Sequence, residues 1–158
     1  MCGLVGICGR VNFNAEEVTY KMIRLLKHRG PDNINVFSSK DAPIDIGHSR
    51  LSIIDLSDLG NQPMTTDSGK YTIAYNGEIY NFLEIKKKIL SKKIINFKSK
   101  TDTEILLYAF EILGIENTLN TVKGMFSIFL YNNFEKKIYL INDIFGEKPL
   151  YYTLQDGV

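Results

Sequence analysis

The chain has 158 residues, the length of about one domain, and its 19 Lys and Arg against 18 Asp and Glu leave a formal net charge of +1. This balance gives no electrostatic reason to expect binding to nucleic acid or to an anionic membrane surface. The 44% hydrophobic and 23% charged residues are typical of a folded domain, and 2 Cys are too few for a disulfide scaffold or a four-cysteine metal site. We read no targeting signal and no apolar run of membrane-spanning length, and therefore expect a reducing, cytoplasmic setting.

The first half of the chain predicts strands around one helix. In order, we expect a strand over residues 4–7, a helix over 15–27, strands over 34–37 and 44–54, and a polar turn at 57–62. Asn14 stands three residues before Glu17, a pattern typical of a capping box at the start of a helix. The apolar residues that follow at helical spacing are Val18, Met22, Leu25 and Leu26.

The second half predicts helices followed by strands. We expect a strand over 71–75, a helix over 82–90 with Ile85 and Ile89 inward, a helix from Thr101 to Gly114, and strands over 125–131, 137–142 and 150–153. Asp156-Gly157 is a hairpin signal with only Val158 after it, so we expect the chain to be a fragment of a longer protein. Strands first, helices in the middle and strands last indicate an α+β fold with mainly antiparallel sheets.

Cys2 is the most informative residue for the function of the chain. A Met before a small residue is normally removed, which would leave Cys2 with a free α-amine beside its own thiol. Such an amine has a pKa of about 7.7–8.0 and can accept the thiol proton near neutral pH. The alternative is that Cys2 is a small apolar residue at the start of a strand, and position alone leaves the two readings even. Cys8 is interpreted as a buried core cysteine.

Four further residues are candidates for a ligand site. The Asn76 amide and the Gly77 backbone N–H are suitable donors for an oxyanion, although the local sequence favours a simple hairpin turn. Arg50 lies in an apolar stretch and needs a carboxylate partner, for which an acid of the protein itself is favoured. Asp102 opens a helix, where an acid is stabilising, and this structural role is favoured; the functional alternative is an acceptor for a ligand ammonium group. Together they outline a site for an amino acid with an amide side chain.

Several longer segments of the chain match a family pattern. They are MCGLVGI at the start, HRGPD at 28–32, GHSRLSIIDLS at 47–57, NQPM at 61–64, YNGEIYN at 75–81, TDTE at 101–104, GMFSIFLY at 124–131 and DIFGEKPLYY at 143–152. In this order they resemble the glutaminase domain of glutamine-hydrolysing asparagine synthases, within the class II glutamine amidotransferases. One departure is Asn142, where the family commonly has Arg, and we expect it to alter a structural contact rather than the chemistry.

The resemblance implies a four-layer α/β/β/α sandwich of two mainly antiparallel sheets, the N-terminal-nucleophile hydrolase fold. Residues 2–158 would be the glutaminase domain, truncated at its C-terminus and without its synthetase domain. Cys2 would be the nucleophile, with Asn76 and Gly77 as oxyanion donors and no metal. The residues implied to bind glutamine are Arg50, Leu51, Ser52, Ile53, Ile54, Asn76, Gly77, Glu78 and Asp102.

The implied activity is hydrolysis of L-glutamine to glutamate and ammonia, which feeds the ATP-dependent conversion of aspartate to asparagine. This segment would need no cofactor, because ATP and Mg²⁺ belong to the absent synthetase domain, a partner in cis or in trans. No nucleic acid or membrane partner is expected, and a homodimer is one option. Two alternatives stay open: a different carboxylate acceptor, such as a sugar acid, and a glutamine-binding domain without turnover.

Overall fold

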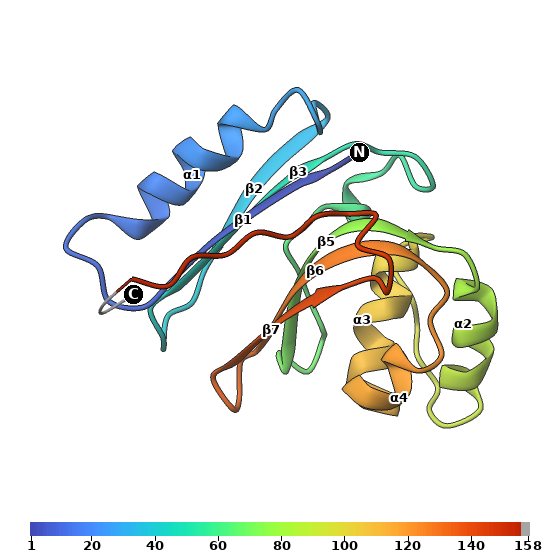
Figure 1. Ribbon diagram of the computed structural model, residues 1–158. Helices are drawn as coiled ribbons and strands as arrows, with labels where there is room; N and C mark the ends of the chain where they lie inside the picture. Colours follow the sequence, from blue (N-terminus) through green and yellow to red (C-terminus); the bar gives the residue numbers. More distant parts are fainter. Residues whose placement is uncertain (156–158) are drawn as a thin grey trace.

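Two antiparallel sheets pack face to face, and helices cover the outer face of each (Figure 1). The structure, a computed structural model, describes residues 1–155. Helix α1 covers one sheet, whereas helices α2, α3 and α4 cover the other. This arrangement confirms the expected α+β fold and its four α/β/β/α layers.

The first sheet brings the start of the chain beside the end of its central strand. Its strands are β1 (Gly3–Cys8), β2 (Asn33–Ser38) and β3 (Ile44–Arg50), in the order β1-β3-β2. Gly3 pairs with Ser49 in the β1–β3 ladder. Because neighbouring residues in an antiparallel pair run in opposite directions, this register places Cys2 beside Arg50.

The second sheet is a meander in which the longest strands are adjacent. Its strands are β4 (Met64–Thr65), β5 (Tyr71–Ile79), β6 (Gly124–Asn132) and β7 (Lys137–Asn142), in the order β4-β5-β6-β7. Asn76 pairs with Ser127 and Gly77 with Phe126 in the β5–β6 ladder. The last two strands, β6 and β7, form an antiparallel hairpin.

Helices α1 and α3 begin where their capping residues predict, whereas α4 is not expected from the sequence. The helices are α1 (Ala15–Leu25), α2 (Phe82–Leu90), α3 (Asp102–Leu113) and α4 (Ile115–Leu119), with a short 3-10 turn at Asp58–Gly60. Asn14 Oδ1 accepts the Glu17 backbone N–H at 3.1 Å, and Thr101 Oγ1 accepts that of Glu104 at 3.2 Å. Both side-chain caps satisfy a backbone donor that the helix itself leaves free.

Two apolar cores hold the layers together. One lies between the second sheet and helices α2 and α3, and includes the fully buried Ile85 and Ile89, as the sequence predicts. The other lies between the two sheets, where Ile46 faces Phe129 and Tyr131. Within residues 1–155, no helix combines the length and apolarity required to cross a bilayer.

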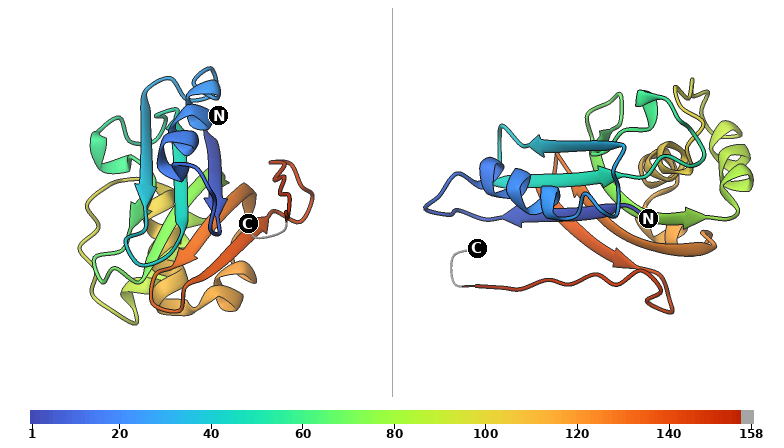
Figure 2. Two further views of the ribbon diagram at one scale, coloured as in Figure 1. Left: turned by 90° about the vertical axis from the view of Figure 1, so that its left-hand side faces the viewer. Right: turned by 90° about the horizontal axis from the view of Figure 1, so that it is seen from above.

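Three sequence expectations are wrong. Asn76-Gly77 is not a hairpin turn but lies inside β5, because pairing with β6 across the sheet outweighs the local turn preference. The strand expected over 44–54 ends at Arg50. Residues 150–153 form no strand: the segment after β7 has no ladder partner, and Figure 2 shows it extending away from β7. The Asp156-Gly157 signal lies outside the described residues.

Helix α1 buries Thr19 and Ile23 against the sheet. A Cβ at Gly47 on β3 would meet both side chains, so the missing side chain lets the helix approach closely. Of the apolar residues that predict the helix, Val18 and Leu26 are half-buried, whereas Met22 and Leu25 are exposed. Ile23 is 0% exposed, whereas Leu25, two residues later, is 77% exposed.

Replacing Ile23 by Ala is expected to lower the free energy of unfolding by about 2–5 kcal/mol, because it opens a cavity in the core. Leu25→Ala is the matched control on the same helix and should change it by no more than about 0.5 kcal/mol. Urea unfolding of both variants measures the difference. Equal destabilisation by the two variants would contradict this placement of α1.

Candidate active site

A cavity opens where the start of β1, the end of β3, the middle of β5 and the start of α3 meet. It gathers all but one of the predicted site residues: Cys2, Arg50, Leu51, Ile53, Ile54, Asn76, Gly77, Glu78 and Asp102 line it. The exception is Ser52, whose backbone N–H donates to Asp32 Oδ2 at 2.7 Å. Segments up to 100 residues apart in sequence therefore contribute to one site.

The Cys2 sulfur lies directly before β1 and is held there by the residues that follow β3. Sγ accepts a hydrogen bond from the Leu51 backbone N–H at 3.4 Å, and Arg29 Nε donates to the Cys2 carbonyl oxygen at 3.1 Å. Burial raises the pKa of the Cys2 thiol, while the Leu51 hydrogen bond acts in the opposite direction. A thiol in this setting needs a nearby base or a positive field to ionise at neutral pH.

Arg50 is 5% exposed, but its partners are not the expected carboxylate. Nη1 donates to the Ser57 carbonyl oxygen at 2.6 Å and to Asn61 Oδ1 at 2.9 Å, and Nη2 donates to the Asp55 carbonyl oxygen. None of the salt bridges within residues 1–155 includes Arg50. Neutral acceptors orient the guanidinium without cancelling its charge, which favours an anionic ligand group in the cavity.

The loop that holds Arg50 is tied to the start of α3. Asp55 accepts hydrogen bonds from the backbone N–H of Lys100 at 2.8 Å and from Ser57, and these bonds lower the pKa of Asp55 to about 2. A Cβ at Gly60 would collide with the Arg50 guanidinium, so glycine lets the loop close over the arginine.

Asn76 and Gly77 are held in β5 by contacts on both sides of the strand. A Cβ at Gly77 would collide with the Met125 carbonyl and with Phe126, so glycine allows β6 to approach here. Tyr75, the residue before Asn76, is also fixed. Its backbone N–H donates to Gln62 Oε1 at 2.7 Å, and its carbonyl oxygen accepts from His48 Nε2 at 3.1 Å. Burial lowers the pKa of His48 to about 4, so this donor is a neutral imidazole at neutral pH.

Asp102 presents a buried carboxylate from the first turn of α3. Its Oδ2 accepts hydrogen bonds from Tyr75 Oη at 2.8 Å and from the Ile79 backbone N–H at 2.9 Å. Burial raises the pKa of Asp102, although these hydrogen bonds act to lower it. The carboxylate is thus aimed and partly desolvated, as an acceptor for a ligand ammonium group would be.

Local sequence reasoning missed part of the cavity lining. Gln62, Tyr75, Thr103, Met125 and Lys148 also line it. Gln62 and Lys148 stand within two of the matched segments, but no local feature distinguishes them from surface residues. Their position depends on how the two sheets meet, which neither spacing nor composition encodes.

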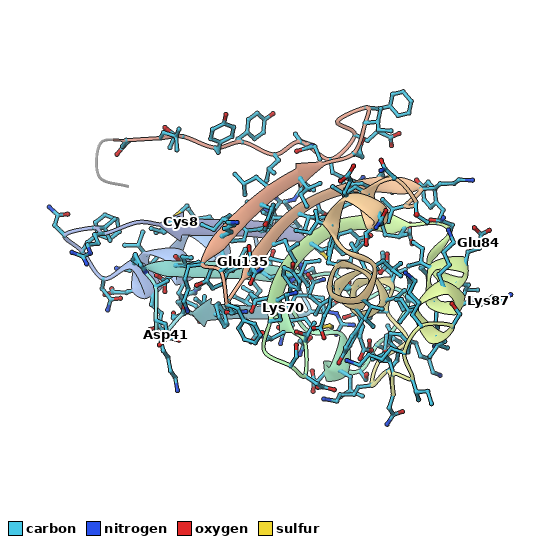
Figure 3. The ribbon with its side chains drawn as sticks, turned by 90° about the horizontal axis from the view of Figure 1, so that it is seen from below. Cys8, Asp41, Lys70, Glu84, Lys87 and Glu135 are labelled. Atoms are coloured by element: carbon cyan, nitrogen blue, oxygen red, sulfur yellow. The ribbon has the colours of Figure 1, made fainter. Side chains whose placement is uncertain are left out.

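Two residues outside the cavity complete the comparison with the sequence. Cys8 is half-buried against the core between the sheets rather than fully buried, and lies at the far end of β1 from Cys2 (Figure 3). Asn142 Nδ2 donates to the Lys148 carbonyl oxygen at 2.7 Å, a hydrogen bond between two neutral groups. The described residues contain no cluster of His, Cys, Asp or Glu suited to a metal ion.

Comparison with known proteins agrees with this geometry. A profile described as glutamine amidotransferase domain matches residues 1–158. The chain is 36% identical over 157 residues to asparagine synthetase (glutamine-hydrolyzing) 1 of Bacillus subtilis strain 168, covering 97% of this chain and 24% of that protein. It is 31% identical over 150 residues to amidase chry2 of Gibberella zeae, covering 93% of this chain and 22% of that protein.

Among solved structures, the chain is similar to glutamine phosphoribosylpyrophosphate amidotransferase from B. subtilis in complex with ADP and GMP. The TM-score is 0.66 at 20% identity, over 82% of this chain and 35% of that one, which shows a shared N-terminal-nucleophile hydrolase fold. The chain therefore belongs to the glutamine amidotransferase domain family. It spans about a quarter of the length of the curated relatives it matches.

Asp102→Asn is expected to stabilise the folded chain at pH 7. Because burial raises the folded-state pKa of Asp102 above its ordinary 3.8, the unfolded chain releases this proton more readily, and the carboxylate lowers stability as pH rises above 3.8. Urea unfolding from pH 7 to pH 4 should show the advantage of the variant shrinking as pH falls. A variant less stable than the wild type at pH 7 would contradict this reading of Asp102.

Proposed function

We propose that this domain hydrolyses L-glutamine to glutamate and ammonia, with Cys2 as the nucleophile once Met1 has been removed. The observation that carries the proposal is the convergence of a thiol, an uncompensated guanidinium and an aimed carboxylate on one cavity. Membership of the glutamine amidotransferase domain family supports the same substrate.

Charge complementarity orients the substrate. The Arg50 guanidinium binds the α-carboxylate of glutamine, and the backbone around Leu51, Ile53 and Ile54 lines the same part of the cavity. The Asp102 carboxylate, assisted by Glu78, accepts the α-ammonium group. These contacts place the side-chain amide toward Cys2. The implied role of the Ser52 backbone N–H competes with its bond to Asp32.

The reaction divides into acylation and hydrolysis. The free Cys2 amine accepts the thiol proton, and the sulfur attacks the amide carbon to form a tetrahedral intermediate. The Asn76 amide and the Gly77 backbone N–H stabilise the oxyanion. The intermediate breaks its C–N bond as the ammonium form of the Cys2 amine protonates departing ammonia, leaving a γ-glutamyl thioester. Water then cleaves the thioester to glutamate and restores the thiol.

Removal of Met1 is necessary because the amine is otherwise tied up in a peptide bond. An amide nitrogen cannot accept a proton near neutral pH, whereas a free α-amine has a pKa of about 7.7–8.0. Because burial raises the pKa of the Cys2 thiol, the thiol needs a base to remove its proton, and the free Cys2 amine is that base. A thiol nucleophile also favours the reducing, cytoplasmic setting.

The released ammonia serves a larger protein. Because the chain spans about a quarter of its relatives, we propose that residues 2–158 act with a synthetase domain, in cis or in trans, that uses ATP and Mg²⁺ to activate aspartate. The names of the asparagine synthetase relatives support this acceptor. Amidase chry2 is a relative whose name is not that of an asparagine synthetase, so we keep a second candidate, a different carboxylate acceptor. An acceptor screen with the full-length protein separates the two.

The test of the proposal is covalent labelling of Cys2. A glutamine analogue bearing an electrophilic diazoketone should modify the N-terminal peptide of the Met1-processed chain, and excess glutamine should protect it, as mass spectrometry of the peptides will show. Cys2→Ala should abolish labelling and glutamate release. Cys8→Ala, which removes the other cysteine, should leave both unchanged because Cys8 lies outside the cavity.

Labelling of Cys8 or of another side chain would contradict the proposal, as would full glutamate release by Cys2→Ala. Labelling of Cys2 without any glutamate release, by the chain alone or with its synthetase partner, would favour the glutamine-binding domain without turnover.

A further inference from the structure

Lys148 is a buried cation that the proposed mechanism does not use. It is 8% exposed and lines the same cavity as Cys2. Its backbone is fixed after β7: its N–H donates to Asp143 Oδ2 at 3.2 Å, and its carbonyl accepts from Asn142 Nδ2 at 2.7 Å. The same Asp143 oxygen accepts the Phe126 N–H at 3.1 Å, which ties this turn to β6. The turn thus presents the side chain to the cavity from a rigid base.

The Lys148 ammonium has a poor partner. Its Nζ lies 2.9 Å from Met1 Sδ, and none of the salt bridges among residues 1–155 includes it. A thioether is a weak acceptor, and an ammonium group withdrawn from water is costly unless it is well paired. The partner is moreover part of the residue that must leave to free the Cys2 amine.

We propose that Lys148 is a positioning residue for the nucleophile: after Met1 leaves, its ammonium faces the freed Cys2 amine. It leaves more of that amine neutral before the reaction, so that the amine can accept the thiol proton, and it stabilises the thiolate that results. The contact with Met1 Sδ supports this geometry, because Met1 is bonded directly to the Cys2 nitrogen and so brings Lys148 within one residue's reach of it. The inference rests on the proposed function and names a residue that regulates the charge state of its nucleophile.

The effect follows from the signs of the charges. A nearby cation disfavours the ammonium form of an amine and favours the thiolate form of a thiol. Both effects help the reaction, because the amine must be neutral to act as a base and burial alone raises the pKa of the Cys2 thiol. The Lys148 charge therefore lowers the pKa of the Cys2 thiol, which burial raises.

The other charged groups around the cavity do not supply this effect by themselves. Arg50, on β3, acts in the same direction, but its guanidinium donates to three oxygen atoms of the adjacent loop. Asp102 on α3 raises the pKa of Cys2, and Glu78 on β5 and Asp55 in the loop after β3 also line the cavity. On the turn that carries Lys148, Asp143 and Glu147 are the acids. With three acids and Arg50 lining the cavity, Lys148 supplies the second cation.

The experiment measures the pH dependence of Cys2 alkylation in the Met1-processed chain. Iodoacetamide is the probe. The N-terminal peptide of a tryptic digest carries both cysteines, so its fragmentation in the mass spectrometer locates the label on Cys2 or on Cys8. Lys148→Met retains the length of the side chain and the backbone bonds of the turn but removes the charge. It should move the midpoint upward by about one pH unit and slow alkylation at pH 7 by about tenfold.

Two matched variants complete the design. Lys148→Arg keeps the charge and should restore the wild-type midpoint. Lys87→Met removes a charge from the exposed face of α2, well away from the cavity, and should leave the midpoint unchanged (Figure 3). Thermal unfolding checks that each variant folds, and Lys148→Gln replaces the methionine variant if that one does not.

A wild-type midpoint in Lys148→Met, or an equal shift in Lys148→Arg, would overturn the proposal. Because alkylation needs no glutamine, this result is independent of glutamate release. A shifted midpoint in a chain that fails to hydrolyse glutamine would contradict the proposed function and leave Lys148 assigned. An unshifted midpoint in a chain that does hydrolyse glutamine would contradict the role of Lys148 and leave the proposed function standing.

Discussion

The register between β1 and β3 is the constraint on which the site depends. Because Gly3 pairs with Ser49, the residue before β1 meets the residues after β3, and the Leu51 N–H reaches the Cys2 sulfur. A shift by one residue would turn Cys2 to the other face of the sheet. A Cβ at Gly3 would collide with Ser49 Oγ and Leu26, so glycine permits this close approach. The first sheet thereby fixes the position of the Cys2 thiol, which we propose as the nucleophile.

The second sheet completes the site through one link between the layers. His48, central in β3, donates to the carbonyl of Tyr75 on β5, while the Tyr75 hydroxyl donates to Asp102 on α3. The Asn76-Gly77 segment and the Asp102 carboxylate are therefore held in place relative to β3, the strand that ends beside Cys2. The same cavity collects charges that the fold does not neutralise: a guanidinium on neutral acceptors and an ammonium on a thioether. Such unpaired groups lower stability and are expected where a ligand supplies the missing partner.

Local sequence patterns predict most of the framework here, because it depends on short-range physics. The caps at Asn14 and Thr101 and the inward Ile85 follow from residues within a few positions of each other. Asn76-Gly77 shows the limit, since its turn preference yields to pairing with β6, about fifty residues later. The inward face of α1 depends on a glycine in another strand, and the partners of Arg50 depend on a folded loop. Residue chemistry grouped Arg50, Asn76 and Asp102 into one candidate site, and the family resemblance added the remaining binding residues before the structure brought them together.

The most direct test of the central claim is to stop the reaction midway. The Met1-processed chain is mixed with glutamine, quenched in acid during turnover and examined by mass spectrometry of its peptides. The account predicts a γ-glutamyl thioester on Cys2, located by fragmentation of the N-terminal peptide, which also carries Cys8. Steady release of glutamate with no acyl group on this peptide, or with the acyl group on Cys8, would contradict it.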